Sequence, residues 1–111
     1  MALTKDFRET IRVRAQGDAA FRQGLLREGL ELVYNGDFAT GRAILRNYIN
    51  ATIGFSRLAR VTQISSPSLQ RMFGPSGNPR AENLFGVIAH LKQQEGVDIE
   101  LHVRPRQQSG G

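Results

Sequence analysis

The polar residues with the clearest capacity for chemistry lie between positions 66 and 71. Gln70 and Arg71 are side-chain types that pair well with base edges in the major groove, Gln with adenine and Arg with guanine. Ser66 and Ser68 carry hydroxyls that suit phosphate oxygens, and a helix that begins here would aim its free N–H groups at the same ligand. These residue types in this order favour binding to double-stranded DNA.

A helix-turn-helix would position these side chains, and residues 55–72 have its pattern. Ala59 is the small residue that the first helix needs where the second helix crosses it. Ile64 is the apolar residue of the turn, and Leu69 and Met72 lie three apart on the buried face of the second helix. The residues left facing outward are Ser66, Pro67, Ser68, Gln70 and Arg71.

The same segment also departs from the usual motif. Gln63 stands where the turn usually has glycine, and Thr62 stands where an apolar residue is usual. Ser65 or Ser66 can cap the second helix, and Ser66 is the better cap because Pro67 disfavours helical geometry at the preceding residue. The alternative interpretation is an ordinary pair of core helices with a polar connection.

The basic charge of the chain is concentrated around this segment. The 111 residues carry a formal net charge of +5, and residues 38–81 hold six arginines and no acidic residue. Such a window is typical of a nucleic-acid binder, although six arginines can also form an ordinary solvated surface. Arg57, Arg60 and Arg80 lie in the window and are expected to hold the phosphate backbone on either side of the second helix.

Apolar periodicity predicts a mainly α-helical fold with five to six helices and one C-terminal β-strand. Residues 1–54 are expected to form N-terminal helices within the same compact domain. Residues 55–103 are expected to contain the helix-turn-helix, of Cro/repressor type, and the strand, and residues 104–111 to form a disordered tail. Asp18 is expected to cap a helix that runs to about Tyr34, and Asp37 to cap the next one. Gly24 and Gly29 either weaken the first of these two helices or let another helix pack closely against it.

The strand prediction rests on the alternation of apolar and polar residues from Val97 to Val103. Its apolar face consists of Val97, Ile99, Leu101 and Val103. A lone strand leaves its backbone donors and acceptors unpaired, and the chain offers no second convincing strand. We therefore expect a homodimer in which two copies pair these strands, or pairing with an edge strand of another protein.

The remaining polar residues predict no enzyme, no cofactor and no metal site. The chain has no cysteine, which excludes thiolate nucleophiles and sulfur-ligated metals. His90 and His102 are too far apart in sequence for a metal motif, and Asp98 and Glu100 lack the accompanying cleft residues that acid–base catalysis needs. With no apolar run of about 20 residues and no export signal, we expect a cytoplasmic protein with no membrane partner.

Residues 58–91, LARVTQISSPSLQRMFGPSGNPRAENLFGVIAHL, resemble the addiction-module antidote proteins, which are HigA-like antitoxins with a Cro/repressor-type helix-turn-helix. Residues 76–79, Ser-Gly-Asn-Pro, are the most specific part of the match, and the resemblance covers about residues 20–103. The matching residues are Leu58, Ala59, Ile64, Ser65, Ser68, Leu69, Gly77, Asn78, Pro79, Leu84, Val87 and Leu91.

The resemblance implies a dimeric repressor from a type II toxin-antitoxin module. Such a protein binds its own double-stranded DNA operator and neutralises a toxin of the RelE/ParE/HigB type, here through the helices up to about residue 37 or through the C-terminal strand. Two other hypotheses stand beside it. One is a stand-alone helix-turn-helix transcriptional repressor with no toxin, and the other is a helical adaptor whose basic face binds an acidic protein.

Overall fold

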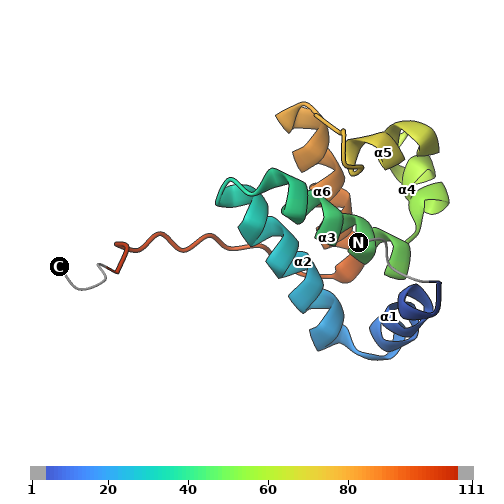
Figure 1. The fold of residues 1–111 in the computed structure, drawn as a ribbon, viewed down its shortest axis with the longest axis horizontal. Coiled ribbons are helices and arrows are strands. Elements are labelled where there is room, and N and C mark those ends of the chain that lie inside the picture. The colour runs from blue at the N-terminus through green and yellow to red at the C-terminus, as the bar shows by residue number, and fades with distance from the viewer. Residues whose placement is uncertain (1–4, 108–111) are drawn as a thin grey trace.

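Six helices form the regular structure of residues 5–107, the part of the chain that this computed structural model describes (side chains from residue 8 onward). The order is α1 (Lys5–Gly17), α2 (Ala19–Tyr34), α3 (Phe38–Ala51), α4 (Phe55–Thr62), α5 (Ser66–Met72) and α6 (Ala81–Glu95). The predicted mainly α-helical class is therefore confirmed (Figure 1). None of the described helices combines the length and apolar character that a membrane span needs.

Short acidic residues begin the second and third helices. The Asp18 carboxylate accepts a hydrogen bond from the Phe21 N–H at 3.0 Å, and Asp37 accepts one from the Thr40 N–H at 3.3 Å. Each carboxylate satisfies a donor that has no acceptor within its own helix. Between them Gly36 has φ 93°, a backbone conformation that glycine adopts freely, so the chain turns sharply from α2 into α3.

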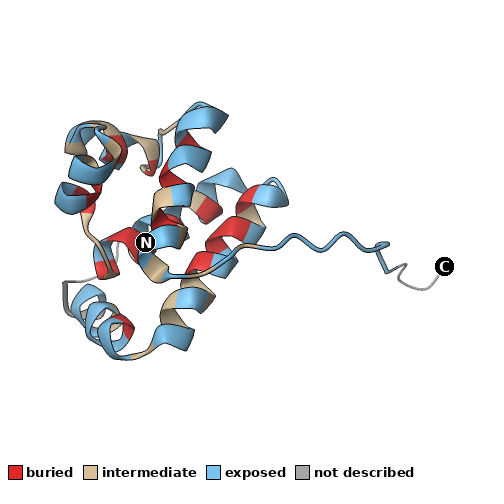
Figure 2. Ribbon diagram, turned by 180° about the vertical axis from the view of Figure 1, so that it is seen from behind, coloured by how far each residue is buried: buried red, intermediate tan, exposed pale blue. Residues whose placement is uncertain are grey.

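One hydrophobic core joins five of the helices (Figure 2). Because α4 and α5 contribute to the same core as α2, α3 and α6, the candidate DNA-binding segment is attached to the rest of the body by packed side chains. The buried residues of this core are Leu26, Leu30, Val33, Leu45, Tyr48, Ile49, Phe55, Leu58, Leu69, Phe73, Leu84, Val87, Ile88 and Leu91.

Two glycines bring α2 and α3 into backbone contact. A Cβ atom at Gly29 would lie 2.8 Å from the Leu45 side chain, and one at Gly41 would lie 2.7 Å from the Val33 side chain and 2.9 Å from the Gly29 carbonyl oxygen. The expected close packing therefore occurs at Gly29. Gly24 has nothing within 4 Å of such an atom, so its position would accept a larger residue.

Replacing the contact glycines should destabilise the fold. We expect Gly29→Ala and Gly41→Ala each to lower the free energy of unfolding by about 1–3 kcal/mol, because a methyl group must push the two helices apart. Gly24→Ala is the matched control in the same helix and should stabilise the protein by about 0.5–1 kcal/mol. Urea denaturation measures all three, and equal stability of Gly29→Ala and wild type would contradict the contact.

A polar network around Glu95 ties four helices together. The Glu95 side chain is 4% exposed, and Arg22 Nε lies 3.0 Å from its Oε2 atom. Tyr48 donates its hydroxyl hydrogen to Glu95 Oε1 at 2.6 Å, and Arg22 Nη1 donates to the Ala15 carbonyl oxygen at 2.7 Å. The ends of α1 and α6 are thereby held against α2 and α3. Burial, and then the hydrogen bond to the Glu95 carboxylate, raise the pKa of Tyr48 above its usual range.

This raised pKa predicts a loss of stability in alkali. The folded chain keeps the Tyr48 proton at pH values where the unfolded chain releases it, so this stabilisation is present below about pH 10 and is lost as the pH rises above it. Tyr48→Phe should cost about 1.5 kcal/mol at neutral pH, the worth of a hydrogen bond to a charged group.

Tyr48→Phe should also flatten the alkaline decline, measured by urea denaturation across a pH series. Tyr34→Phe controls for loss of a phenol hydroxyl, because Tyr34 is 47% exposed. An alkaline decline as steep in Tyr48→Phe as in wild type would show that another group causes it.

The segment after α6 differs from the prediction, because the described residues contain no β-strand. Gly96, with φ 72°, ends α6, and the Val97 N–H donates back to the Lys92 carbonyl oxygen at 3.1 Å. No backbone hydrogen bond then joins residues 98–107 to any other described residue. The prediction of a strand is wrong for the single chain because a strand is built from hydrogen bonds to a neighbour, and one copy offers none.

The same segment extends away from the helices (Figure 1). Of the predicted apolar face, Val97 and Ile99 are partly buried against the core, whereas Leu101 and Val103 are 65% and 98% exposed. Of the predicted disordered tail, residues 104–107 have no regular secondary structure. Residues 108–111 lie outside the described part of the chain.

Candidate nucleic-acid interface

Helices α4 and α5 pack against each other and are joined by residues 63–65. Leu58 of α4 and Leu69 of α5 are fully buried. Ala59, Ile64 and Met72 are partly buried against the core, as the apolar pattern predicts. The opposite faces of both helices are consequently free to carry polar side chains.

The turn between the helices accommodates both departures from the usual motif. Gln63 has φ 60° and ψ 26°, and it is the one non-glycine residue with positive φ in the described chain. Glycine adopts this left-handed conformation without the strain that a Cβ atom brings. The Thr62 hydroxyl donates to the Leu58 carbonyl oxygen at 2.8 Å and accepts from the Ile64 N–H at 3.3 Å, so its polar group is satisfied.

The strain at Gln63 can be measured. Gln63→Gly should raise the free energy of unfolding by about 0.5–1 kcal/mol, because relief of roughly 1–2 kcal/mol of strain exceeds the entropy that glycine adds to the unfolded chain. Gln63→Val should lower it, because a β-branched residue tolerates positive φ least. Thermal unfolding of the two variants beside wild type tests this, and a Gln63→Gly protein less stable than wild type would contradict it.

Helix α5 begins one residue earlier than expected, because Ser65 is the cap. Its hydroxyl accepts a hydrogen bond from the Ser68 N–H at 3.2 Å, and its carbonyl oxygen accepts from the Leu69 N–H at 2.9 Å. The preference for Ser66 as the cap is therefore wrong. Pro67 is tolerated within the first helical turn because the N–H it lacks would have no acceptor within the helix.

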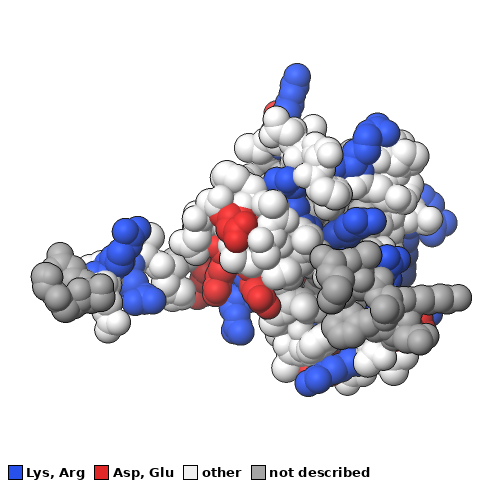
Figure 3. All heavy atoms as spheres, in the orientation of Figure 1, with Lys and Arg blue, Asp and Glu red and all other residues white. Residues whose placement is uncertain are grey.

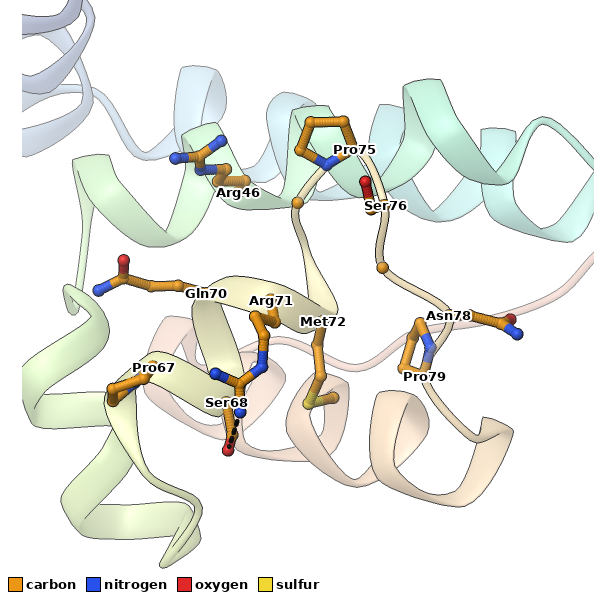
Figure 4. Close-up of a pocket in the computed structure, with 12 residues that line it drawn as sticks. Arg46, Pro67, Ser68, Gln70, Arg71, Met72, Pro75, Ser76, Asn78 and Pro79 are labelled. Atoms are coloured by element: carbon orange, nitrogen blue, oxygen red, sulfur yellow. Dashed lines mark hydrogen bonds between the residues drawn. The ribbon is translucent and has the colours of Figure 1, made fainter.

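The predicted outward residues do share one face of α5. Pro67, Gln70 and Arg71 are exposed, and Ser66 and Ser68 are partly exposed. Gln70 Nε2 donates to the Ser66 hydroxyl oxygen at 3.2 Å. Arg71 Nη2 donates to the Ser68 hydroxyl oxygen at 3.2 Å, the dashed line in Figure 4. The two long side chains thus fold back along the helix toward its N-terminus and must exchange these bonds to reach a ligand.

A hollow of about 710 Å³ lies beside this face and is lined by α5, the loop 74–79 and Arg46 of α3 (Figure 4). Arg46 also lines a second hollow of about 730 Å³, together with Arg8 and Arg12 of α1. Sequence reasoning missed Arg46 as a site residue. It lies in the acid-free window, but only the tertiary fold brings Arg46 of α3 to the same hollow as α5.

Gly77 holds the loop against the end of α5. A Cβ atom at Gly77 would overlap the Arg71 carbonyl oxygen and lie 2.6 Å from that of Met72. The Gly77 N–H donates to the Gly74 carbonyl oxygen at 3.0 Å, which closes a tight turn. No other residue type fits at position 77 without moving the loop.

The arginines that flank α5 lie on its neighbours rather than in the hollow. Arg57 and Arg60 are exposed on α4 and Arg80 is exposed before α6, and none of the three lines the hollow. None of the ion pairs in the described chain involves a residue of the 38–81 window. The charge of this surface is therefore not neutralised by a carboxylate within the described chain.

Charge is divided between two parts of the visible surface (Figure 3). Basic side chains spread over the side that carries α4 and α5, whereas acidic side chains gather near the root of the C-terminal segment. A polyanion would be drawn to the first and repelled by the second.

The histidines and the paired acids of the sequence form no cluster in the described residues. His90 is partly buried on α6, while Asp98, Glu100 and His102 are exposed on the C-terminal segment. His102 Nε2 lies 3.6 Å from Glu100 Oε2, and both side chains are about four-fifths exposed, at 83% and 78%. No group of three or more His, Cys, Asp or Glu in the described chain is placed to hold a metal ion.

Comparison with known proteins identifies no relative: no family model, no curated protein and no solved structure matches the chain.

Proposed function

We propose that this chain is a sequence-specific DNA-binding antitoxin that represses its own operon in the cytoplasm and neutralises a RelE/ParE/HigB-like toxin. The observation that carries the DNA-binding part is the exposed polar face of α5, set on a packed α4–α5 pair. It lies within a basic window whose arginines pair with no carboxylate of the described residues. The toxin partner is supported by the sequence resemblance.

In this proposal α5 enters the major groove. Arg71 and Gln70 release Ser68 and Ser66 and bond base edges instead, Arg71 to guanine and Gln70 to adenine. Pro67 offers an apolar surface that suits a thymine methyl group. The freed Ser66 and Ser68 hydroxyls bond phosphate oxygens and fix the helix in register.

Phosphate contacts come from the exposed arginines around α5. Arg57 and Arg60 on α4 and Arg80 before α6 would hold the backbone on either side of the groove. Each phosphate neutralised releases bound counterions from DNA, so affinity should fall steeply as salt concentration rises. The acidic partner of a protein-binding adaptor carries no such counterion atmosphere. The affinity of an adaptor would therefore not fall in this way as salt concentration rises.

Arg71→Ala tests the assignment of base contacts. We expect it to weaken operator binding by about 1–3 kcal/mol and to relax sequence preference at one base position. Fluorescence anisotropy with a duplex selected from a random library gives the affinity, and repeating the selection with the variant gives the preference. Arg27→Ala is the matched control, since Arg27 is an exposed arginine on α2 paired with Glu31 at 4.0 Å. A selected duplex that binds Arg71→Ala as tightly as wild type would refute the role of Arg71.

Arg57→Ala and Arg60→Ala separate phosphate contacts from base contacts in the same assay. Each should weaken binding to all sequences alike and reduce the salt slope by about one, without changing the selected sequence. Binding that does not weaken with rising salt would favour the adaptor.

Isolation of the tagged chain from its native cells tests the toxin part separately. A toxin-sized partner that co-purifies supports an antitoxin. Its absence, with operator binding intact, would indicate the stand-alone repressor.

A further inference from the structure

In the extended segment after α6, side chains alternate in polarity, and the polar ones also reverse in charge along the chain. Odd positions from 97 to 105 are apolar, and even positions from 98 to 106 are polar. Along the polar positions the charge reverses: Asp98 and Glu100 are acidic, His102 lies in the middle, and Arg104 and Arg106 are basic. The charge pattern is thus antisymmetric about His102.

We propose that two copies of the chain pair these segments as antiparallel strands about a two-fold axis at His102. Opposite His102 then lies His102 of the second copy. Glu100 lies opposite Arg104 of the second copy, and Asp98 lies opposite its Arg106. Cross-strand neighbours of opposite charge stabilise a sheet and like charges destabilise it, so parallel pairing, which sets acid beside acid, is disfavoured.

Other registers use the charges less completely. The two paired strands form a two-stranded ribbon with one apolar and one polar face. A slip by one residue sets polar positions opposite apolar ones and so mixes these two faces. A two-fold axis at Leu101 sets Asp98 opposite Arg104 but leaves Arg106 opposite Gly96. An axis at Val103 sets Glu100 opposite Arg106 but brings His102 opposite Arg104. The register centred on His102 is the one in which both carboxylates meet both guanidinium groups.

Pro105 fits the same register. Hydrogen-bonded and non-hydrogen-bonded pairs alternate along an antiparallel ladder. When the His102 pair is hydrogen-bonded, the other even positions are too, and the odd positions point their backbone nitrogens away from the partner strand. Pro105 has no N–H to donate, so at such a position it removes no hydrogen bond from the ladder.

Burial in the single chain also indicates that the apolar face of the ribbon lies toward the helices. Val97 and Ile99 already pack against the core of their own copy, whereas Leu101 and Val103 are 65% and 98% exposed. In the proposed register Leu101 lies opposite Val103 of the second copy, so both exposed residues gain an apolar neighbour. Backbone groups of residues 98–107, which have no hydrogen bond to other described residues, gain partners at the same time.

Charge reversal tests the proposal without DNA, so its outcome is independent of the proposed function. In full-length chains, Asp98→Arg/Glu100→Arg makes the polar positions all basic, and Arg104→Glu/Arg106→Glu makes them all acidic. Sedimentation should show wild-type dimers and at least about tenfold weaker self-association for each variant alone. An equimolar mixture of the two variants should form a one-to-one heterodimer, because every pair is again of opposite charge.

Two controls exclude simpler explanations. The helical signal in circular dichroism should be unchanged, because the substitutions lie outside all the described helices. Glu28→Arg/Glu31→Arg makes the same change of charge as Asp98→Arg/Glu100→Arg, but on exposed positions of α2. This control should dimerise as wild type does. A monomeric wild type, unaltered self-association of the charge variants, or no heterodimer in the mixture would each overturn the proposal.

A single introduced cysteine tests the register. The natural chain has no cysteine, so His102→Cys can form a disulfide only with its counterpart in a second copy. Directly opposed residues of a hydrogen-bonded pair have Cα atoms about 5.5 Å apart, within disulfide range. We expect rapid oxidation to a covalent dimer for His102→Cys and little for Asp98→Cys. The reverse order would overturn the register.

Discussion

The buried carboxylate of Glu95 is the contact on which the arrangement of the helices depends. It receives the Arg22 guanidinium and the Tyr48 hydroxyl, and Arg22 in turn bonds the end of α1. A buried charge without these partners would be costly, so the network forms in full or the end of α6 moves. Because α3 and α6 also carry the apolar residues that support α4 and α5, this contact helps to fix where the polar face of α5 points.

Two other sets of contacts, nearer to α5, also fix the position of its polar face. Gly29 and Gly41 let α2 and α3 approach to backbone contact, which positions α3 and therefore Arg46 beside α5. The left-handed Gln63 and the tight approach of Gly77 to the end of α5 fix the entry to and exit from that helix. Such positions are typical of functional surfaces, where backbone strain is tolerated for the sake of geometry.

These constraints act on a surface where acidic and basic side chains are separated. Carboxylates pair with arginines on α1, on α2 and between α2 and α6, while the arginines of residues 38–81 have no acidic partner in the described chain. Acidic side chains gather instead near the root of the C-terminal segment, where they would repel a polyanion. One chain can thus offer one surface to a polyanion and another to its own copy.

Much of this was determined by local sequence. Helix periodicity, the caps Asp18 and Asp37, and the buried face of Leu69 and Met72 follow from interactions within a few residues, so the sequence predicts them. Ser65, rather than Ser66, caps α5, because its hydroxyl is the one that accepts from the Ser68 N–H. The preference based on Pro67 alone does not predict this choice between neighbouring serines. Arg46 at the hollow and Glu95 between Arg22 and Tyr48 depend on contacts between residues far apart in the chain, which periodicity does not encode. The same distinction applies after Gly96: alternation determines which side chains share a face, but a strand exists only where another backbone supplies its hydrogen bonds.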